Sequence, residues 1–246
     1  MCYPIGKRTT DAHFLCQTKI GDEMNVFDIL GPIMIGPSSS HTAGAARIGL
    51  VARTLLGQDA ARAEILLHGS FAKTYRGHGT DRALVAGILG MHPDDERLRD
   101  ALTLAKERNV AIDFVETDID GAHPNTAEIH LTASDGSTTS VRGASVGGGN
   151  IRITRINDFP VSLTGEFFTL VIIHRDTPGA IAEVTDALRE GGANICHFDL
   201  SRKSRGGEAI MSISVDALPN LDSVSLVQKI QGLDNIYSVI AIPAII

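Results

Sequence analysis

The stretch that decides the fold of the second half of the chain is FFTLVIIHRDTPGAIAEVTDALREGGANICHF, residues 167–198. It predicts a strand over 167–174, a helix over 180–190 and a second strand over 194–202. Downstream, strand patterns at 208–215 and 236–242 flank a helical pattern at 223–231. The resulting order, βαββαβ, is that of a ferredoxin-like split unit.

The first half of the chain predicts a separate α+β domain. Helices are expected over 43–56, 81–89 and 94–109, and strands over 64–68, 111–116, 126–133, 138–142 and 151–156. The segment 157–166 contains a proline and a glycine and predicts a linker. The expected organisation is therefore a disordered tail over 1–23, a first domain over 24–156, the linker over 157–166 and a second domain over 167–246.

The composition indicates a globular protein with a small polar ligand. The chain has 246 residues, 43% of them hydrophobic, which is enough for two modest domains. Its net charge of -7, without a cluster of Lys and Arg, argues against a protein that binds nucleic acid or an anionic membrane. No run approaches the roughly 20 apolar residues of a membrane helix, and the N-terminus lacks the apolar core of a signal peptide. We therefore expect a cytoplasmic protein.

The cysteines are too few and too widely spaced for a disulfide framework. They are Cys2, Cys16 and Cys196, and this usage fits a reducing compartment. Cys196 lies in a strand pattern, so we expect a buried, unreactive thiol. If Met24 is the biological start, Cys2 and Cys16 are absent from the natural protein.

A cluster of hydroxyl side chains precedes the first predicted helix: Ser38, Ser39, Ser40 and Thr42, with His41 among them. The N-terminus of a helix attracts a carboxylate, because its N–H groups are unpaired and its dipole end is positive. One of these serines could simply cap the helix. Since one cap needs only one hydroxyl, the cluster favours a site for the carboxylate of an amino acid.

Residues 69–81, GSFAKTYRGHGTD, predict a glycine-spaced loop between a strand and a helix. Loops in this position commonly carry binding or catalytic residues. Thr80 or Asp81 could instead cap the helix that follows. His78 stands between two glycines and has no comparable structural duty.

The turn His123-Pro124-Asn125-Thr126 precedes a predicted strand. Its imidazole and amide could project from the edge of the sheet, but a Pro-Asn turn is ordinary loop chemistry, so the residues alone favour a structural role for His123. The glycine run at 147–149 lacks the spacing of a dinucleotide or phosphate loop. We exclude nucleotide binding and expect the glycines to allow close backbone approach at a bulge or domain contact.

Together these motifs resemble the beta chain of two-subunit, iron–sulfur-dependent L-serine dehydratase. The resemblance extends over nearly all of 24–242 and rests on NVFDILGP (25–32), GPSSSHTAG (36–44), GHGTD (77–81) and HPNT (123–126). From residue 167 onward the chain resembles an ACT domain, through the turn Pro178-Gly179-Ala180 and the junction Ala193-Asn194-Ile195.

The resemblance implies an L-serine ammonia-lyase of amino-acid catabolism and gluconeogenesis, which converts L-serine to pyruvate and ammonia. It also implies a [4Fe-4S] cluster that acts as a Lewis acid on the substrate hydroxyl, held by cysteines of a partner alpha subunit and by no ligand of this chain. By the same resemblance, His41 and His78 handle protons. The residues expected to bind substrate are Ser38, Ser39, Ser40, Thr42, Thr80, Asp81, His123, Asn125 and Thr126.

For the second domain, we expect a small amino acid such as serine to bind near Gly179 and Asn194. An exposed edge strand of a βαββαβ sheet can pair with a second copy and leave a ligand-sized gap at the contact. The expected partners are therefore the alpha subunit, L-serine and a second copy of this chain.

Two other functions remain open at this point. A non-catalytic amino-acid sensor would also use both domains, although three histidine motifs and a serine cluster exceed what binding alone needs. A pyridoxal-phosphate dehydratase needs a Schiff-base lysine and a phosphate cradle. Lys73 is the only lysine in the motif region and no cradle is evident, so this function is disfavoured.

Overall fold

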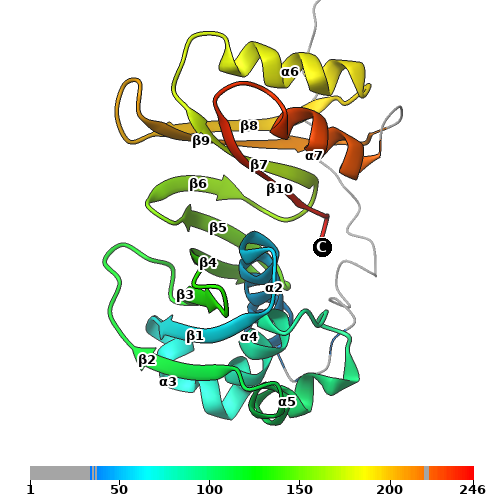
Figure 1. Cartoon of the computed structure of the whole chain (residues 1–246). Coiled ribbons are helices and arrows are strands. Elements are labelled where there is room, and N and C mark those ends of the chain that lie inside the picture. Colours follow the sequence, from blue (N-terminus) through cyan, green and yellow to red (C-terminus); the bar gives the residue numbers. More distant parts are fainter. Residues whose placement is uncertain (1–33, 35, 37, 219–221) are drawn as a thin grey trace, which may run out of the picture. The chain divides into compact units, whose positions relative to one another are not determined.

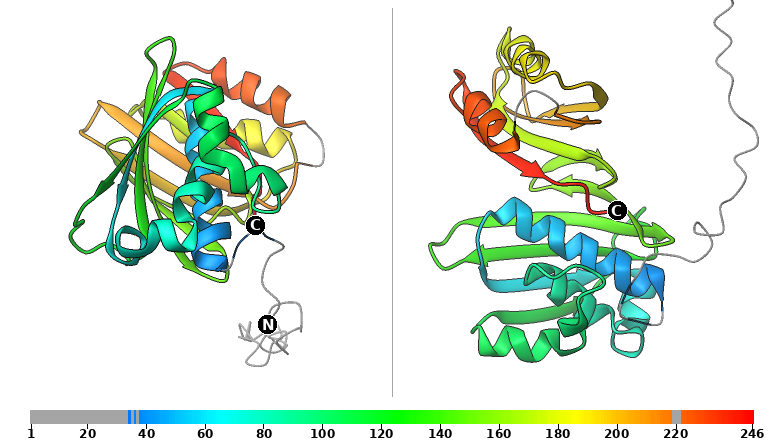
Figure 2. Two further views of the ribbon diagram at one scale, coloured as in Figure 1. Left: turned by 90° about the horizontal axis from the view of Figure 1, so that it is seen from below. Right: turned by 90° about the vertical axis from the view of Figure 1, so that its right-hand side faces the viewer.

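The computed structural model describes Met34, Gly36 and residues 38–218 and 222–246, which contain two β-sheets (Figures 1 and 2). The expected tail over 1–23, the alternative start at Met24 and the motif at 25–32 lie outside these residues, as do Cys2 and Cys16.

The first sheet has six strands in the order β2-β1-β3-β4-β5-β6. They are β1 (Ala60–Leu67), β2 (Ala111–Glu116), β3 (Thr126–Ala133), β4 (Thr138–Gly147), β5 (Asn150–Ile156) and β6 (Phe159–Leu163). β1 and β2 run parallel, whereas the other neighbouring strands run antiparallel. Parallel neighbours need a long crossover, and the segment between β1 and β2 supplies it with α3 (Gly69–His78), α4 (Thr80–Ile88), the 3-10 turn η2 (Glu96–Asp100) and α5 (Ala101–Glu107).

Helix α2 (Ala45–Leu56) packs on β3 and β4 of this sheet and crosses α4 at close range (Figures 1 and 2). Two glycines permit the crossing. A Cβ atom on Gly87 would lie 2.0 Å from the carbonyl oxygen of Ala46, and one on Gly49 would lie 2.3 Å from that of Leu84. The backbones of the two helices therefore touch where neither residue has a side chain.

The structure overturns the expectation of a loop over 69–81. Residues 69–78 form helix α3 instead. Phe71 and Tyr75 stand four residues apart, so both fall on one helical face, and both are buried. Gly79, with a φ of 74°, ends α3 and lets α4 begin at Thr80.

The segment expected to be a linker, 157–166, contains strand β6, which pairs with β5. Phe159, Val161 and Leu163 are buried, whereas the residues between them are exposed. Pro160 suggests a break in structure, but an edge strand tolerates a proline because its outward N–H needs no partner. The first sheet therefore continues to Leu163.

The second sheet has the order β10-β7-β9-β8 and is antiparallel throughout. Its elements are β7 (Phe168–Arg175), α6 (Ala180–Glu190), β8 (Ile195–Arg202), β9 (Glu208–Val215), α7 (Ser223–Gln231) and β10 (Ile236–Ile242). The predicted βαββαβ order is confirmed, and the whole chain is α+β. Both sheets belong to one compact unit, because Val171, Ile210 and Ile242 join the same hydrophobic cluster as Ile153 and Leu163.

Strand β8 lies at the edge of the second sheet, and this position contradicts the expectation for Cys196. The thiol is free and exposed rather than buried. An apolar run predicts a strand, but only the strand order decides whether both of its faces are covered.

Candidate functional site

The first helix begins earlier than expected, at a π-helical turn, η1, that spans Ser39–Gly44 and continues into α2. Ser38 is the N-cap, and its hydroxyl accepts the backbone N–H of His41 at 3.3 Å. Ser39, Ser40, His41 and Thr42 therefore lie inside the turn rather than before a helix at 43. Isolated π-helical turns are frequent at functional sites, because they place an extra side chain where a regular helix could not.

His41 is the central side chain of this turn. It is 9% exposed. Its Nδ1 lies 3.4 Å from the Ser38 hydroxyl, and its Nε2 lies 3.3 Å from the hydroxyl of Ser70. The His78 ring stands almost perpendicular to it, with the ring centres 4.8 Å apart. The structure therefore brings together the two histidines that were predicted to handle protons.

The environment of His41 lowers its pKa. Burial is the larger cause, because it disfavours the protonated ring, and the nearby charge of His78 acts in the same direction. His41 is consequently neutral at neutral pH. A neutral imidazole can accept a proton, which is what a general base must do.

Thr80 and Asp81 lie in the first turn of α4, and both are buried. The Asp81 carboxylate accepts the backbone N–H of Arg82 at 2.8 Å. Burial raises the pKa of Asp81, and the hydrogen bond from Arg82 opposes this shift. Asp81 is not the N-cap of α4, because Gly79 occupies that position.

Three buried hydroxyls near η1 and α4 have no hydrogen-bond partner among the described residues: Thr42 Oγ1, Thr80 Oγ1 and Ser145 Oγ. A Cβ atom on Gly44 would lie 2.1 Å from Ser145 Oγ, so Ser145 of β4 lies directly against the turn. Buried polar groups are normally paired. Three unpaired hydroxyls in one region are therefore unusual for a protein interior, and of the three residues Thr42 also lines the cavity described next.

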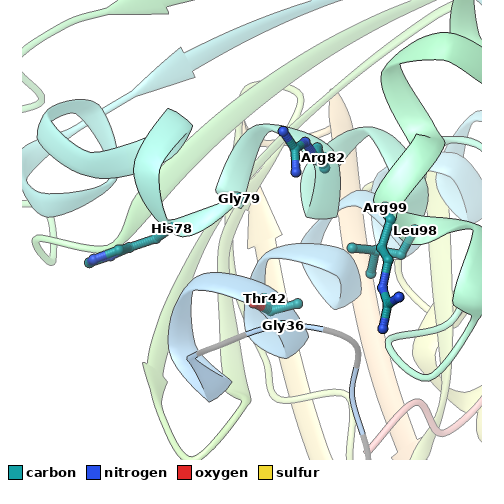
Figure 3. A pocket seen from close by; sticks show the side chains of 7 residues that line it. All are labelled: Gly36, Thr42, His78, Gly79, Arg82, Leu98 and Arg99. Atoms are coloured by element: carbon teal, nitrogen blue, oxygen red, sulfur yellow. The ribbon is translucent and has the colours of Figure 1, made fainter.

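A cavity of about 300 Å³ opens beside this region, lined by Gly36, Thr42, His78, Gly79, Arg82, Leu98 and Arg99. In Figure 3 the imidazole of His78 points away from Arg82 and Arg99. Neither arginine has an ion-pair partner in the part of the chain that the structure describes. Two unneutralised guanidinium groups favour an anionic ligand such as a carboxylate.

The side chains of His123 and Thr126 form hydrogen bonds within the 123–126 turn itself. His123 Nδ1 accepts the backbone N–H of Asn125 at 3.1 Å, and the Thr126 hydroxyl donates to the His123 carbonyl at 2.7 Å. His123 and Thr126 line a second cavity of about 310 Å³, together with Arg142 and Arg152. Of the residues predicted to bind substrate, Thr42 lines the first cavity, His123 and Thr126 line the second, and the others line neither of the two.

This turn nevertheless reaches His41 through the backbone. The carbonyl of Pro124 accepts the N–H of Ser70 at 2.7 Å, and Ser70 is the residue whose hydroxyl faces His41 Nε2. The side-chain amide of Asn125 donates to the Ser145 carbonyl at 3.4 Å. The 123–126 turn therefore does not contact His41 itself but supports the site through its hydrogen bonds to Ser70 and Ser145.

Sequence reasoning missed Ser70, Ser145, Arg82 and Arg99, and it also missed the buried Arg47. A sequence signal existed only for Ser70, which directly follows Gly69, the glycine two residues after the end of β1. Arg47 of α2 donates to the Gly149 carbonyl at 2.7 Å, and burial lowers its pKa. The glycine run forms the turn between β4 and β5 with three positive φ angles, and no backbone lies within 4 Å of an added Cβ at Gly147 or Gly148, so the expectation of close backbone approach there is wrong.

The residues predicted to bind a regulatory ligand lie at opposite ends of α6. Gly179 is its N-cap, with a φ of 96°, and Asn194 follows its C-terminal end. A helix of 11 residues spans about 16 Å at 1.5 Å per residue. The Asn194 amide donates to the Asp216 carboxylate at 2.7 Å.

The described residues do not offer a thiolate set for an iron–sulfur cluster. Cys196 is the only cysteine among them. They also contain no group of three or more His, Cys, Asp or Glu side chains that could hold a metal ion. Within the same residues, no helix is long and apolar enough to span a membrane.

Comparison with known families bears directly on these motifs. The family model for the serine dehydratase beta chain matches residues 25–155, which include η1, α3, α4 and the 123–126 turn. The chain belongs to the serine dehydratase beta chain family. The resemblance noted from its motifs is thereby confirmed.

Related proteins extend the match across most of the chain. A probable L-serine dehydratase beta chain of Bacillus subtilis is 43% identical over 215 residues, which is 87% of this chain and 96% of the relative. The L-serine dehydratase beta chain of Peptoniphilus asaccharolyticus is 37% identical over 195 residues, 79% of this chain and 88% of the relative. Among solved structures, the ACT domain from GTP pyrophosphokinase of Chlorobium tepidum covers 30% of this chain and 95% of its own, with a TM-score of 0.24 and 19% identity.

Proposed function

We propose that this chain is the beta subunit of a cytoplasmic L-serine dehydratase that, with an alpha subunit, converts L-serine to pyruvate and ammonia. Family membership and the names of the two beta-chain relatives support this substrate and this partner. The observation that carries the proposal is a buried His41 whose ring centre lies 4.8 Å from that of His78, beside a cavity lined by two arginines.

The reaction makes demands that these residues can meet. Removing the α-proton requires a base, and holding the substrate requires a fixed partner for its carboxylate. Arg82, Arg99 and the Thr42 hydroxyl line the cavity where a carboxylate would bind. His41 and His78 are the groups that exchange protons, and buried Asp81 orients the substrate or the histidines.

We also propose that a [4Fe-4S] cluster is held by the alpha subunit, because the described residues of this chain lack the thiolates that such a cluster needs. When bound, the cluster supplies a Lewis acid for the leaving hydroxyl of serine. The isolated beta chain should then bind no stoichiometric iron and be colourless. Iron bound in stoichiometric amounts by the isolated chain contradicts this part of the proposal.

The test of the catalytic proposal is anaerobic co-expression with the alpha subunit, followed by an assay of pyruvate formation from L-serine. His41→Ala and His78→Ala should each lower turnover by roughly 10²- to 10⁴-fold, as expected for lost acid–base groups. The matched control is His92→Ala, an exposed histidine in the turn after α4. If both site variants keep wild-type turnover, the two histidines are structural. If the wild-type complex binds serine without turnover, the chain is a sensor.

For the C-terminal unit we propose an ACT domain that binds a small amino acid between two copies of the chain. The ends of α6 are too far apart for one small ligand to contact both Gly179 and Asn194 of the same protomer. A ligand at a contact between copies can touch Gly179 of one protomer and Asn194 of the other, and it would then couple serine level to assembly.

Removing the C-terminal unit is a poor test, because Ile242 and Ile245 belong to the hydrophobic cluster of the first sheet. A sharper test is sedimentation of the full chain with and without serine, for the wild type and for Gly179→Val. A Cβ atom on Gly179 would have only Glu183 Oε1 nearby, at 3.9 Å, but the φ of 96° strains any side chain there, so circular dichroism must first show that the variant is folded. Serine should change the oligomer of the wild type but not of the variant. No effect of serine on either protein contradicts the proposal.

A further inference from the structure

Among the described residues, Ser70 is a polar side chain beside His41 to which no motif assigns a role. It is the second residue of α3 and is partly exposed. Its hydroxyl lies 3.3 Å from His41 Nε2, whereas Ser38 approaches Nδ1 from the other side at 3.4 Å. Both nitrogens of the ring are therefore next to a serine hydroxyl.

The backbone around Ser70 is fixed from two directions. Its N–H donates to the Pro124 carbonyl at 2.7 Å, and its own carbonyl accepts the Thr74 hydroxyl at 2.7 Å. A Cβ atom on Gly69 would lie 2.6 Å from the same Pro124 oxygen, so only glycine allows this approach. The start of α3 is thus held against the 123–126 turn, and Ser70 has a set position relative to His41.

The remaining contacts of His41 do not by themselves fix the rotation of its ring. Phe71 and His78 contact the ring edge-on, with centres at 5.3 Å and 4.8 Å. Such aromatic contacts are weak and allow a range of geometries. Hydrogen bonds to the two nitrogens are directional and select one orientation of an imidazole.

We propose that Ser70 is a positioning residue of this site, whose hydroxyl, together with that of Ser38, holds the His41 imidazole in one orientation for proton transfer. The inference rests on the proposed role of His41 and deepens it. It also gives the 123–126 turn a function, because this turn holds Ser70 in place through Pro124.

The first readout is turnover of the full complex with the alpha subunit. Ser70→Ala should lower kcat by roughly 10- to 100-fold with little change in KM, since a displaced base costs less than a missing one. Ser70→Thr keeps a hydroxyl and should restore most of the activity. The control is Thr185→Val in α6, which removes a helix hydroxyl that donates to the backbone carbonyls of Ile181 and Ala182 and has no contact with Ser70 or His41.

The second readout needs no activity. In the full-length beta chain labelled with ¹⁵N-histidine, the His41 ring signals are assigned by their loss in His41→Gln. Ser70→Ala should move these signals and their pH titration, whereas Ser70→Thr and Thr185→Val should leave them near the wild type. Unmoved signals in Ser70→Ala overturn the inference, even if turnover falls, because Ser70 would then act on the substrate instead.

The two readouts separate this inference from the proposed function. If His41→Ala loses turnover while Ser70→Ala keeps both its turnover and its His41 signals, only the inference fails. If His41→Ala keeps turnover, the catalytic assignment itself fails, and Ser70 has no role in the reaction.

Discussion

The region around η1 and α4 and the C-terminal βαββαβ unit use glycine in opposite ways. In the first region Gly44, Gly49 and Gly87 sit where a Cβ atom would overlap a neighbouring chain segment. In the C-terminal unit Gly179 and Gly206 sit in turns with positive φ, and an added Cβ there would meet open space. Packing between distant segments therefore requires glycine at Gly44, Gly49 and Gly87, whereas local backbone conformation favours it at Gly179 and Gly206, as it also does at Gly79 of the first region.

The first region buries more titratable side chains than the C-terminal unit, in which His174 is the buried one among the described residues. His41, Arg47 and Asp81 are all buried in the first region, and burial shifts the pKa of each away from its charged form. Such groups cost stability unless they are paired. A site that retains them gives up stability for function.

The sharpest test of the packing difference is Gly87→Ala. The new Cβ atom would lie 2.0 Å from the Ala46 carbonyl oxygen and 2.6 Å from the Leu50 nitrogen, so α2 and α4 must separate. We expect the free energy of unfolding to fall by at least about 2 kcal/mol, measured by urea denaturation. The control, Gly77→Ala in α3, adds its Cβ to open space and should be neutral or stabilising. Equal effects of the two variants would refute the close-packing argument.

In the C-terminal unit, the corresponding change is Gly206→Ala in the turn between β8 and β9. The new methyl group meets nothing within 4 Å, so only the positive φ of 74° is penalised. We expect a loss of about 1 kcal/mol, the lower part of the range for strained backbone. A loss as large as that of Gly87→Ala would remove the contrast between the two regions.

Asp81→Asn tests whether the first region gives up stability for function. Because burial raises the pKa of Asp81 above 3.8, ionisation at higher pH costs the folded state more than the unfolded state. The aspartate therefore reduces stability as the pH rises through that range, and asparagine does not. We expect the variant to be more stable at pH 7, by urea denaturation, and less active in the complex. A variant that is less stable across pH 4 to 8 would contradict the expected cost of burial.

The pH dependence of stability gives a smaller effect at His41. Its folded pKa lies below 6.5, so the unfolded state takes up a proton first as the pH falls. The contribution of His41 to stability is complete above about pH 6.5 and is lost as the pH falls through the lowered pKa. His41→Gln should flatten this part of the profile, measured as unfolding free energy between pH 7.5 and 5. An unchanged slope would show that the ring is not held neutral by the fold.

The smallest effect concerns Cys196 on the edge strand β8. Its exposed thiol should react with a thiol reagent in the native protein, in a Cys2→Ser/Cys16→Ser background. Burial of part of the side chain and the charge of Asp216 raise its pKa, so the reaction should be slower than that of a free thiol at neutral pH. If Cys196 reacts only after denaturation, its thiol is buried, as the sequence pattern predicted, and the exposed position is wrong.

The helices and strands of the C-terminal unit could be predicted from the sequence because a periodic hydrophobic pattern runs through each of them. The bounds of α6, β9, α7 and β10 agree with those expected from the sequence. In the first half, β2 and β3 agree equally well. The prediction failed at α3, where glycines at both ends suggested a loop although Phe71 and Tyr75 bury one helical face.

For the candidate site, the sequence determined which side chains are available: the hydroxyl cluster at 38–42, His78, the buried turn of α4 and the family to which the chain belongs. Only the tertiary structure decided which of them meet. It set His78 beside His41, brought the Ser70 hydroxyl to Nε2 of the His41 ring, and placed His123 and Thr126 at a second cavity. The physical reason is that these contacts join residues about 30 positions or more apart, and they depend on a helix crossing and a backbone hydrogen bond that leave no periodic trace in the chain.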